Sequence, residues 1–425
     1  MEIYNIITIL IVLAALFGYI NHRFIKLPGS IGIMLFSLVA SLIIVAAGRI
    51  FPAFFMKITA VVSTIDFQTA VLEVMLGFLL FAAAIQVDIK KFRKERTSII
   101  VFSTIGVLIS TIVVGLLLYG VTLLFGLSVN LLYCLLFGSL ISPTDPVAVV
   151  GILKKAKIPS SLETKISGES LFNDGIGVVL FIMFYEIAQI GLVNISVWDV
   201  AWLFLRETGG GLLLGALLGY MGFYVLRSID NYVVEVMTTL AIVMGGYLLA
   251  GKLFVSGPLA MVVAGLITGN KIMGEVMSDV TRDYLGKFWE MVDEVMNAIL
   301  FLLIGLAMLI IPFNATLLWL GFITIAIVLF ARFLSVSLPI AVLNKKKPFE
   351  KNTIPILTWG ALRGGISVAL ALSVPKYMYG DMFVSITYIV VLFSIIVQGL
   401  TIGKFAKRIQ DSTHDATEPE IKRAG

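Results

Sequence analysis

The chain is built from thirteen long apolar runs, which follow one another with short polar segments between them. An α-helix needs about 20 apolar residues to cross a bilayer, so runs of this length are typical of transmembrane helices. Apolar residues make up 59% of the 425 residues and charged residues 13%, against roughly 45–50% and 25% in soluble domains. The sequence therefore predicts an all-α polytopic membrane protein with about 13 transmembrane helices. The predicted helices span residues 4–20, 31–48, 69–87, 98–125, 129–151, 163–192, 202–227, 233–250, 255–269, 290–311, 315–342, 353–374 and 383–405.

The lysine and arginine residues are distributed unevenly between the two sides that these helices define. Of the 31 cationic residues, 24 fall in the tail or in loops on one side, four fall in loops on the other side, and three lie within helices. Because cytoplasmic loops carry the excess of positive charge, the N-terminus is predicted outside and the C-terminus in the cytoplasm. The first apolar run lacks a preceding basic segment, which indicates a retained helix in a multi-pass protein of the cell membrane.

The composition also excludes several kinds of partner. A net charge of +5 could suggest nucleic acid, but the basic residues form short clusters between apolar runs and no basic face, so no nucleic-acid partner is expected. One cysteine and two histidines exclude a disulfide framework and a histidine-based metal site. The lipid bilayer is the partner that remains, and no cofactor is expected.

Two of the predicted helices, the fifth and the twelfth, are interrupted near their middle. Residues 141–147 contain two prolines and residues 359–365 contain three glycines. Proline removes a backbone hydrogen bond, and freed carbonyls at membrane depth are tolerated only where protein or a water-filled cavity meets them. The two helices occupy corresponding places in two sets of six helices that a seventh helix joins, which predicts two inverted six-helix repeats with crossing broken helices. A matched pair of broken helices is typical of a transport site.

Several charged side chains lie within otherwise apolar segments. They are the acids Glu73, Asp145, Glu169 and Asp174 and the cations Arg332 and Arg363. Each costs at least about 2.5–3.5 kcal/mol near the bilayer centre, so the set needs partners or a function. Buried salt bridges between helices are one interpretation. Four acids and two arginines do not neutralise one another, so at least one carboxylate is left for a cation or a proton.

The sixth predicted helix carries polar residues on two adjacent faces. At 3.6 residues per turn, Ser170 and Asp174 share one face, while Glu169 and Asn173 share the neighbouring face. A carboxylate with a hydroxyl offers hard oxygen ligands, which suit an alkali cation. Residues 144–145, a threonine and an aspartate at the break in the fifth helix, could add further oxygen ligands, including unwound backbone carbonyls.

Three motifs, in order along the chain, resemble those of one transporter family. They are Thr144-Asp145-Pro146, the pairs Glu169-Ser170 and Asn173-Asp174, and Leu362-Arg363-Gly364-Gly365. At these residues, and over nearly its whole length, the chain resembles the NhaP-type, sodium/proton exchanger-like branch of the monovalent cation/proton antiporter superfamily. The resemblance implies a secondary transporter, not an enzyme, that exchanges sodium or lithium ions for protons by an elevator-type alternating-access motion.

The resemblance also implies an assembly and a division into domains. The protein would be a homodimer. Its dimerisation domain would comprise residues 1–97 and 200–312, and its core transport domain would comprise residues 98–199 and 313–408. Residues 409–425 would form a disordered cytoplasmic tail.

The same resemblance assigns the residues of an ion site. Asp174 and Asp145 are implied as the carboxylates for which sodium ions and protons compete. Ser170 and Thr144 are implied as neutral oxygen ligands of the sodium ion, and Glu73 as a further carboxylate of the site.

Supporting roles follow in the same way. Glu169 and Arg332 are implied as a structural ion pair, and Arg363 as a residue that stabilises the crossing of the broken helices. Asn173 occupies a position where electrogenic relatives have an aspartate. One titratable ligand fewer implies electroneutral exchange, with one proton for each monovalent ion.

Three alternatives stay open at the level of sequence. A potassium/proton antiporter of the same fold would use the same ligand types. An intramembrane aspartyl protease would also place two aspartates on separate helices, but its Gly-x-Gly-Asp and Tyr-Asp signatures are missing here. A passive channel would conduct ions independently of the proton gradient.

Overall fold

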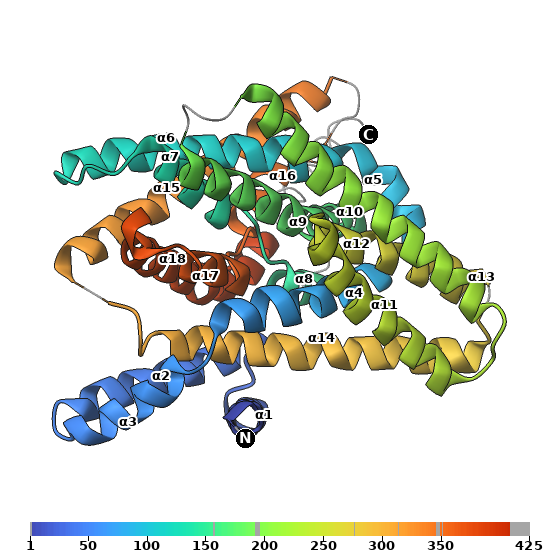
Figure 1. Cartoon of the computed structure of the whole chain (residues 1–425), viewed down its shortest axis with the longest axis horizontal. Helices are drawn as coiled ribbons and strands as arrows, with labels where there is room; N and C mark the ends of the chain where they lie inside the picture. Colours follow the sequence, from blue (N-terminus) through green and yellow to red (C-terminus); the bar gives the residue numbers. More distant parts are fainter. Residues whose placement is uncertain are drawn as a thin grey trace, which may run out of the picture.

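The structure is a computed structural model, and it describes residues 2–155, 158–191, 196–275, 277–312, 314–345, 349–350 and 352–408. These residues form a bundle of packed helices (Figure 1). The predicted all-α fold is thereby confirmed. The predicted tail, residues 409–425, lies outside the described part of the chain.

Each of the thirteen predicted transmembrane segments contains helix. The first six segments hold α1 (Glu2–Ile20) with η1 (Asn21–Ile25), α2 (Gly29–Gly48), η2 (Thr69–Met75) with α4 (Leu76–Ile85), α5 (Ile89–Val101) with η3 (Phe102–Gly106) and α6 (Val107–Leu124), α7 (Leu131–Ile141) with α8 (Val147–Lys155), and α9 (Ser160–Ile190). The other seven hold α10 (Val197–Leu226), α11 (Tyr232–Leu253), α12 (Gly257–Ile267) with η5 (Thr268–Ile272) and α13 (Met273–Glu275), α14 (Asp279–Ala307), α15 (Ala315–Leu343), α16 (Thr353–Trp359) with α17 (Gly365–Leu372), and α18 (Gly380–Phe393) with η7 (Ser394–Gln398). Among the described residues, eight helical stretches are long and apolar enough to cross a membrane.

The helices differ from the sequence prediction in several places, and two of these differences have a clear physical reason. The segment predicted as a loop between the second and third spans contains α3 (Pro52–Ser63), which starts with a proline in its first turn, where a missing N–H is tolerated. With 12 residues, α3 is too short to cross the bilayer alone. The helix predicted to start at residue 290 begins at Asp279, because the Ser278 hydroxyl caps it by accepting the N–H of Thr281. Its first turns are polar, so an apolar run could not reveal them.

Neighbouring helices approach closely where a glycine lies between them. A Cβ added at Gly138 of α7 would lie 2.3 Å from the carbonyl oxygen of Thr111 on α6. A Cβ added at Gly305 of α14 would lie 1.7 Å from the hydroxyl oxygen of Ser37 on α2. Membrane helices associate through small residues of this kind, because lipid provides no hydrophobic force between them.

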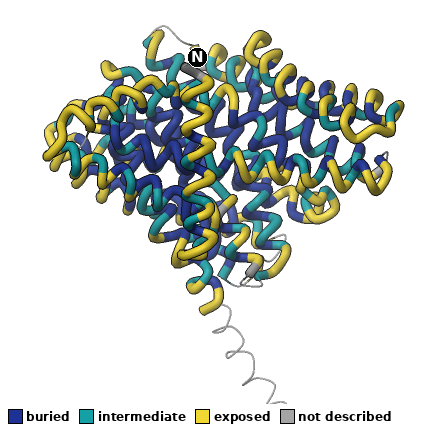
Figure 2. The backbone as a smooth tube through the Cα atoms, turned by 90° about the horizontal axis from the view of Figure 1, so that it is seen from below, coloured by how far each residue is buried: buried dark blue, intermediate teal, exposed yellow. Residues whose placement is uncertain are grey.

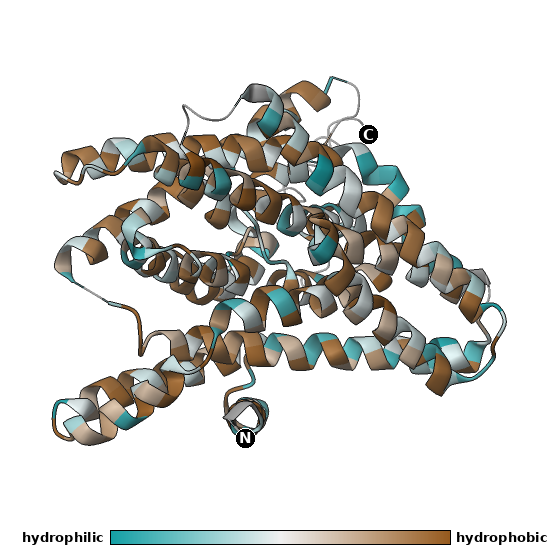
Figure 3. Ribbon diagram, in the orientation of Figure 1, coloured by the Kyte–Doolittle hydropathy of each residue, from teal (hydrophilic) through white to brown (hydrophobic). Residues whose placement is uncertain are grey.

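The outer surface of the bundle is apolar. Buried residues occupy the middle of the bundle and exposed residues its periphery (Figure 2), and the outer helices carry many hydrophobic residues (Figure 3). On α10, Trp198 is 83% exposed, Leu213 74% and Tyr224 70%. Lipid solvates such side chains, whereas soluble monomers rarely expose large apolar patches. The surface therefore fits a multi-pass membrane protein.

The two broken helices cross at their interruptions. The break between α7 and α8 and the break between α16 and α17 lie against each other, because the backbone N–H of Asp145 donates a hydrogen bond to the carbonyl of Leu362 at 2.8 Å. This contact is an isolated antiparallel β-bridge. The predicted crossing is confirmed, and it brings the motif around residue 145 to the motif around residue 363.

Candidate functional site

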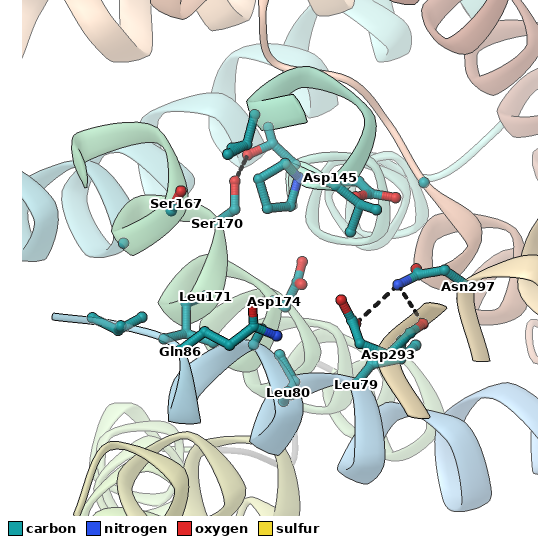
Figure 4. Close-up of a pocket in the computed structure, with 18 of the residues that line it drawn as sticks. Leu79, Leu80, Gln86, Asp145, Ser167, Ser170, Leu171, Asp174, Asp293 and Asn297 are labelled. Atoms are coloured by element: carbon teal, nitrogen blue, oxygen red, sulfur yellow. Dashed lines mark hydrogen bonds between the residues drawn. The ribbon is translucent and has the colours of Figure 1, made fainter. Parts of the chain in front are cut away.

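A cavity of about 600 Å³ lies beside this crossing (Figure 4). Its walls come from α4, α5, the break between α7 and α8, α9, α14 and the start of α17. Four of the five residues predicted as ion ligands line it, namely Thr144, Asp145, Ser170 and Asp174. The fold thus gathers residues from two separate segments of the chain around one space.

A hydrogen-bond network joins α9 to the break in the fifth predicted helix. The hydroxyl groups of Thr144 and Ser170 lie 3.1 Å apart, within hydrogen-bond distance. The side-chain amide nitrogen of Asn173 donates to the Thr144 hydroxyl at 2.8 Å, and the Thr144 backbone N–H donates to the side-chain oxygen Oδ1 of Asn173 at 3.3 Å. Asn173 therefore holds Thr144 in place, and Thr144 connects it to Ser170 at the cavity wall.

Asp145 and Asp174 supply two carboxylates to the cavity. The carboxylate of Asp145 accepts the backbone N–H of Val147 at 2.9 Å, which holds it at the first turn of α8. Asp174 is 9% exposed and lies one helical turn after Ser170 on α9. Both carboxylates line the same cavity, and like charges that share a space repel each other. A cation or a proton relieves such repulsion, so the pair can bind either one.

Glu169 and Arg332 form an ion pair between α9 and α15. Both guanidinium nitrogens Nη1 and Nη2 donate to the carboxylate, Nη1 to Oε1 and Nη2 to Oε2 at 3.0 Å. The Nε of Arg332 donates to the carbonyl of Leu357 at 3.2 Å. Both side chains are buried. This bidentate salt bridge compensates both buried charges, which fits the structural role predicted for the pair.

Arg363 lies at the crossing and is 2% exposed. Its Nη1 donates to the carbonyl oxygens of Ser142 and of Pro143, the latter at 2.9 Å, and its backbone N–H donates to the Ser394 hydroxyl at 2.9 Å. The proline-containing break leaves carbonyls without helical donors. Arg363 replaces these donors, as its predicted role at the crossing requires.

Glu73 is the one predicted ligand that lies apart from the cavity. It is exposed on η2 and is not among the residues that line the cavity. It belongs to the π-helical segment η2, which directly precedes α4, and Leu76 and Leu79 of α4 do line the cavity. The structure does not bring Glu73 to Asp145 and Asp174.

Lys165 of α9 forms a buried ion pair within the helical bundle. Its Nζ lies 3.4 Å from a carboxylate oxygen of Glu95, and both side chains are more than nine-tenths buried. The pair joins α5 to α9. The two residues lie 70 positions apart in the chain, so sequence spacing gives no sign that they meet.

Acidic residues of α14 also line the cavity. They are Glu290, Asp293 and Glu294, accompanied by Asn297. Their spacing of three and four residues places them on one helical face, which is a signal that the sequence already contains. These acids lie in the polar N-terminal part of α14 and not within an apolar run, so they do not stand out in the sequence as intramembrane charges do.

The chain is similar to proteins of known kind over nearly its whole length. The profile of a family described as "Sodium/hydrogen exchanger, transmembrane" matches residues 11–408. The Na(+)/H(+) antiporter NhaP of Pseudomonas aeruginosa is 47% identical over 410 residues, which cover 95% of this chain and 96% of that protein. The Na(+)/H(+) antiporter NhaH of Halobacillus dabanensis is 34% identical over 354 residues, which cover 81% of this chain and 84% of that protein.

A solved structure has a similar fold. The sodium proton antiporter MjNhaP1 from Methanocaldococcus jannaschii superimposes with a TM-score of 0.74 at 18% sequence identity. The match covers 96% of this chain and 98% of the other. At this identity the likeness shows the fold.

Proposed function

The chain belongs to the sodium/hydrogen exchanger family, and on that premise we propose that it is a secondary transporter that exchanges sodium or lithium ions for protons. The observation that carries this proposal is the shared cavity of Asp145 and Asp174, with the hydroxyls of Thr144 and Ser170 beside them. Carboxylates and hydroxyls are hard oxygen ligands, which suit sodium. A carboxylate holds either a cation or a proton, so one site serves both substrates in turn.

The neutral side chain at position 173 supports an electroneutral exchange. Both polar ends of the Asn173 amide are engaged with Thr144, as donor at 2.8 Å and as acceptor at 3.3 Å. Asn173 adds no charge and no proton to the site. One proton exchanged for one monovalent ion is the stoichiometry that this arrangement favours.

The lining of the cavity supports access from the cytoplasm. Four charged residues that line the cavity come from segments that the charge distribution predicts to be cytoplasmic. They are Asp88, Lys91, Lys154 and Glu163. This orientation has the N-terminus outside and the C-terminus in the cytoplasm. The structure then corresponds to an inward-facing conformation.

The position of the cavity supports an elevator-type motion. Asp145, Asp174 and Gly364 belong to the predicted core transport domain, whereas Leu79 and Asp293 belong to the predicted dimerisation domain, and all five line the cavity. A site at the boundary between two bodies changes its access when one body slides against the other. The homodimer is part of this proposal, with residues 1–97 and 200–312 at its interface.

The test is proton movement in proteoliposomes with an internal pH dye, with lithium, sodium and potassium added in turn. We expect sodium or lithium to drive proton movement in the wild type, and Asp174→Asn to abolish it, because the amide keeps the shape and loses the charge. Asp283→Asn, on the exposed part of α14, is the matched control and should transport normally.

The outcomes separate the alternatives. Proton movement that only potassium drives would favour the potassium/proton antiporter, although the similar proteins are named for sodium. A cation flux that ignores the proton gradient would indicate a channel. Substantial exchange by purified Asp174→Asn would contradict the assignment of the site.

A further inference from the structure

Asp293 lies on the wall of the cavity that faces Asp145 and Asp174. It comes from α14, which contributes none of the predicted ion ligands, and its side chain is partly buried (Figure 4). In Figure 4 its carboxylate points into the space that Asp174 and Asp145 border. Three carboxylates, those of Asp145, Asp174 and Asp293, thus border one space, and like charges that share a space repel one another.

Asn297 holds the carboxylate of Asp293 in position. The Asn297 side-chain amide donates to the Asp293 carboxylate at 2.9 Å and to the Asp293 backbone carbonyl at 2.9 Å. Asn297 is 3% exposed, so this contact is shielded from competing water. Because the buried Asn297 amide donates to both the carboxylate and the backbone carbonyl of Asp293, it fixes the orientation of the Asp293 side chain.

Asp293 forms no salt bridge with a cation in the described part of the chain. Lys154 pairs with Glu163 at 3.3 Å, and the carboxylate of Asp88 accepts the backbone N–H groups that begin α5. Its neighbours Glu290 and Glu294 are exposed at the outer part of the wall.

We propose that Asp293 is a third cation-binding carboxylate, which receives the sodium ion from the cytoplasmic side and passes it to Asp145 and Asp174. The proposal rests on the proposed sodium/proton exchange. A cation that moves from Asp293 to Asp145 reduces the electrostatic repulsion between these two carboxylates. It exchanges one carboxylate ligand for another, so it stays close to a negative charge throughout. Asp293 lies on the predicted dimerisation domain, so the ion is handed across the boundary between the two domains.

A purely structural role for Asp293 makes a different prediction. Asp and Asn at a spacing of four residues commonly stabilise a helix. Asp293→Asn keeps the size and an acceptor oxygen for Asn297, so a structural role predicts normal transport by this variant. A cation-binding role predicts a loss, because an amide oxygen carries no charge.

The experiment measures the sodium KM and kcat of purified variants in proteoliposomes. For Asp293→Asn we expect the KM to rise by about tenfold while kcat falls by less than about twofold, since one charge is removed close to a partly buried ion. Asp293→Glu should restore most of the affinity. Glu294→Gln is the matched control, which removes an equal charge from the next residue, and its KM should stay within about twofold of the wild type.

A second measurement separates ligand binding from long-range attraction. The KM values are measured again at high concentration of choline chloride, which screens exposed charges but competes poorly for a carboxylate in a cavity. The increase for Asp293→Asn should persist. An increase that disappears with salt, an equal effect of Glu294→Gln, or an unchanged KM for a folded Asp293→Asn would overturn the proposal. Absence of sodium-driven proton movement in the wild type would instead overturn the proposed function.

Discussion

At the scale of the residue, Gly364 controls the space around Asp145. A Cβ added at Gly364 would lie 2.5 Å from Oδ2 and 2.8 Å from Cβ of Asp145. Both distances are well below van der Waals contact, and the backbone of Asp145 is tied to Leu362. The carboxylate therefore has to move if position 364 gains a side chain.

We accordingly expect Gly364→Ala to reduce sodium-driven proton movement by at least about tenfold, since a misplacement of about 1 Å at a site of this kind has such effects. The measurement is the initial rate of proton movement in proteoliposomes. Gly245→Ala on α11 is the control, because a Cβ there meets open space. Equal rates for Gly364→Ala and the wild type would show that the position of this carboxylate does not limit transport.

At the scale of the element, the buried pair of Glu169 and Arg332 fastens α9 to α15. Removing one partner leaves the other charge buried without compensation, at a cost of roughly 3–5 kcal/mol. Glu169→Ala and Arg332→Ala should each lower the melting temperature in detergent. The double variant should lose less than the sum of the two single losses, since it leaves no uncompensated charge behind.

An exposed salt bridge within a single helix is the control for this buried pair. Lys287 and Asp283 lie 2.7 Å apart on α14 with most of each side chain exposed, and surface pairs contribute little. Lys287→Ala should therefore change the melting temperature only slightly. Strictly additive losses for Glu169 and Arg332 would mean that the two residues act independently.

At the scale of the whole molecule, the cavity that contains the predicted ion ligands adjoins a second, much smaller space. Leu300 and Gly365 border both the cavity and this second space. The second space is lined by apolar residues and Gly365, and its volume is only about 10 Å³. Phe67, Val71 and Leu372 are among its lining residues. This arrangement supports the proposed alternating access, in which an ion reaches the site from one side at a time.

If the same site serves both substrates, sodium and protons compete for it. We expect the sodium KM to rise as the pH falls, by at most about tenfold for each pH unit, because each unit raises the proton concentration tenfold. The measurement is the KM between about pH 6 and about pH 9, with equal pH on both sides of the liposome membrane. A KM that stays constant over this range would indicate separate paths for the ion and the proton.

The fold could be predicted from the sequence because a membrane makes the determinants of the fold local. Each helix that crosses the hydrocarbon must satisfy its own backbone hydrogen bonds and present about 20 apolar residues. The runs that meet this condition are visible in the chain, and so are the breaks at residues 141–147 and 359–365. The motifs on these segments indicated a family that the comparisons confirm. The spacing on the sixth predicted helix likewise placed Ser170 with Asp174.

Only the tertiary structure decided which distant residues meet. Glu73 lies in an apolar segment like the other predicted ligands, yet it is exposed and does not line the cavity. The position of α14 brought Asp293 to the same cavity as Asp145, and the packing of α5 on α9 brought Glu95 to Lys165. The rotation of each helix about its axis depends on the side chains of its neighbours. Sequence therefore determined which segments cross the membrane, and packing determined which of their faces form the site.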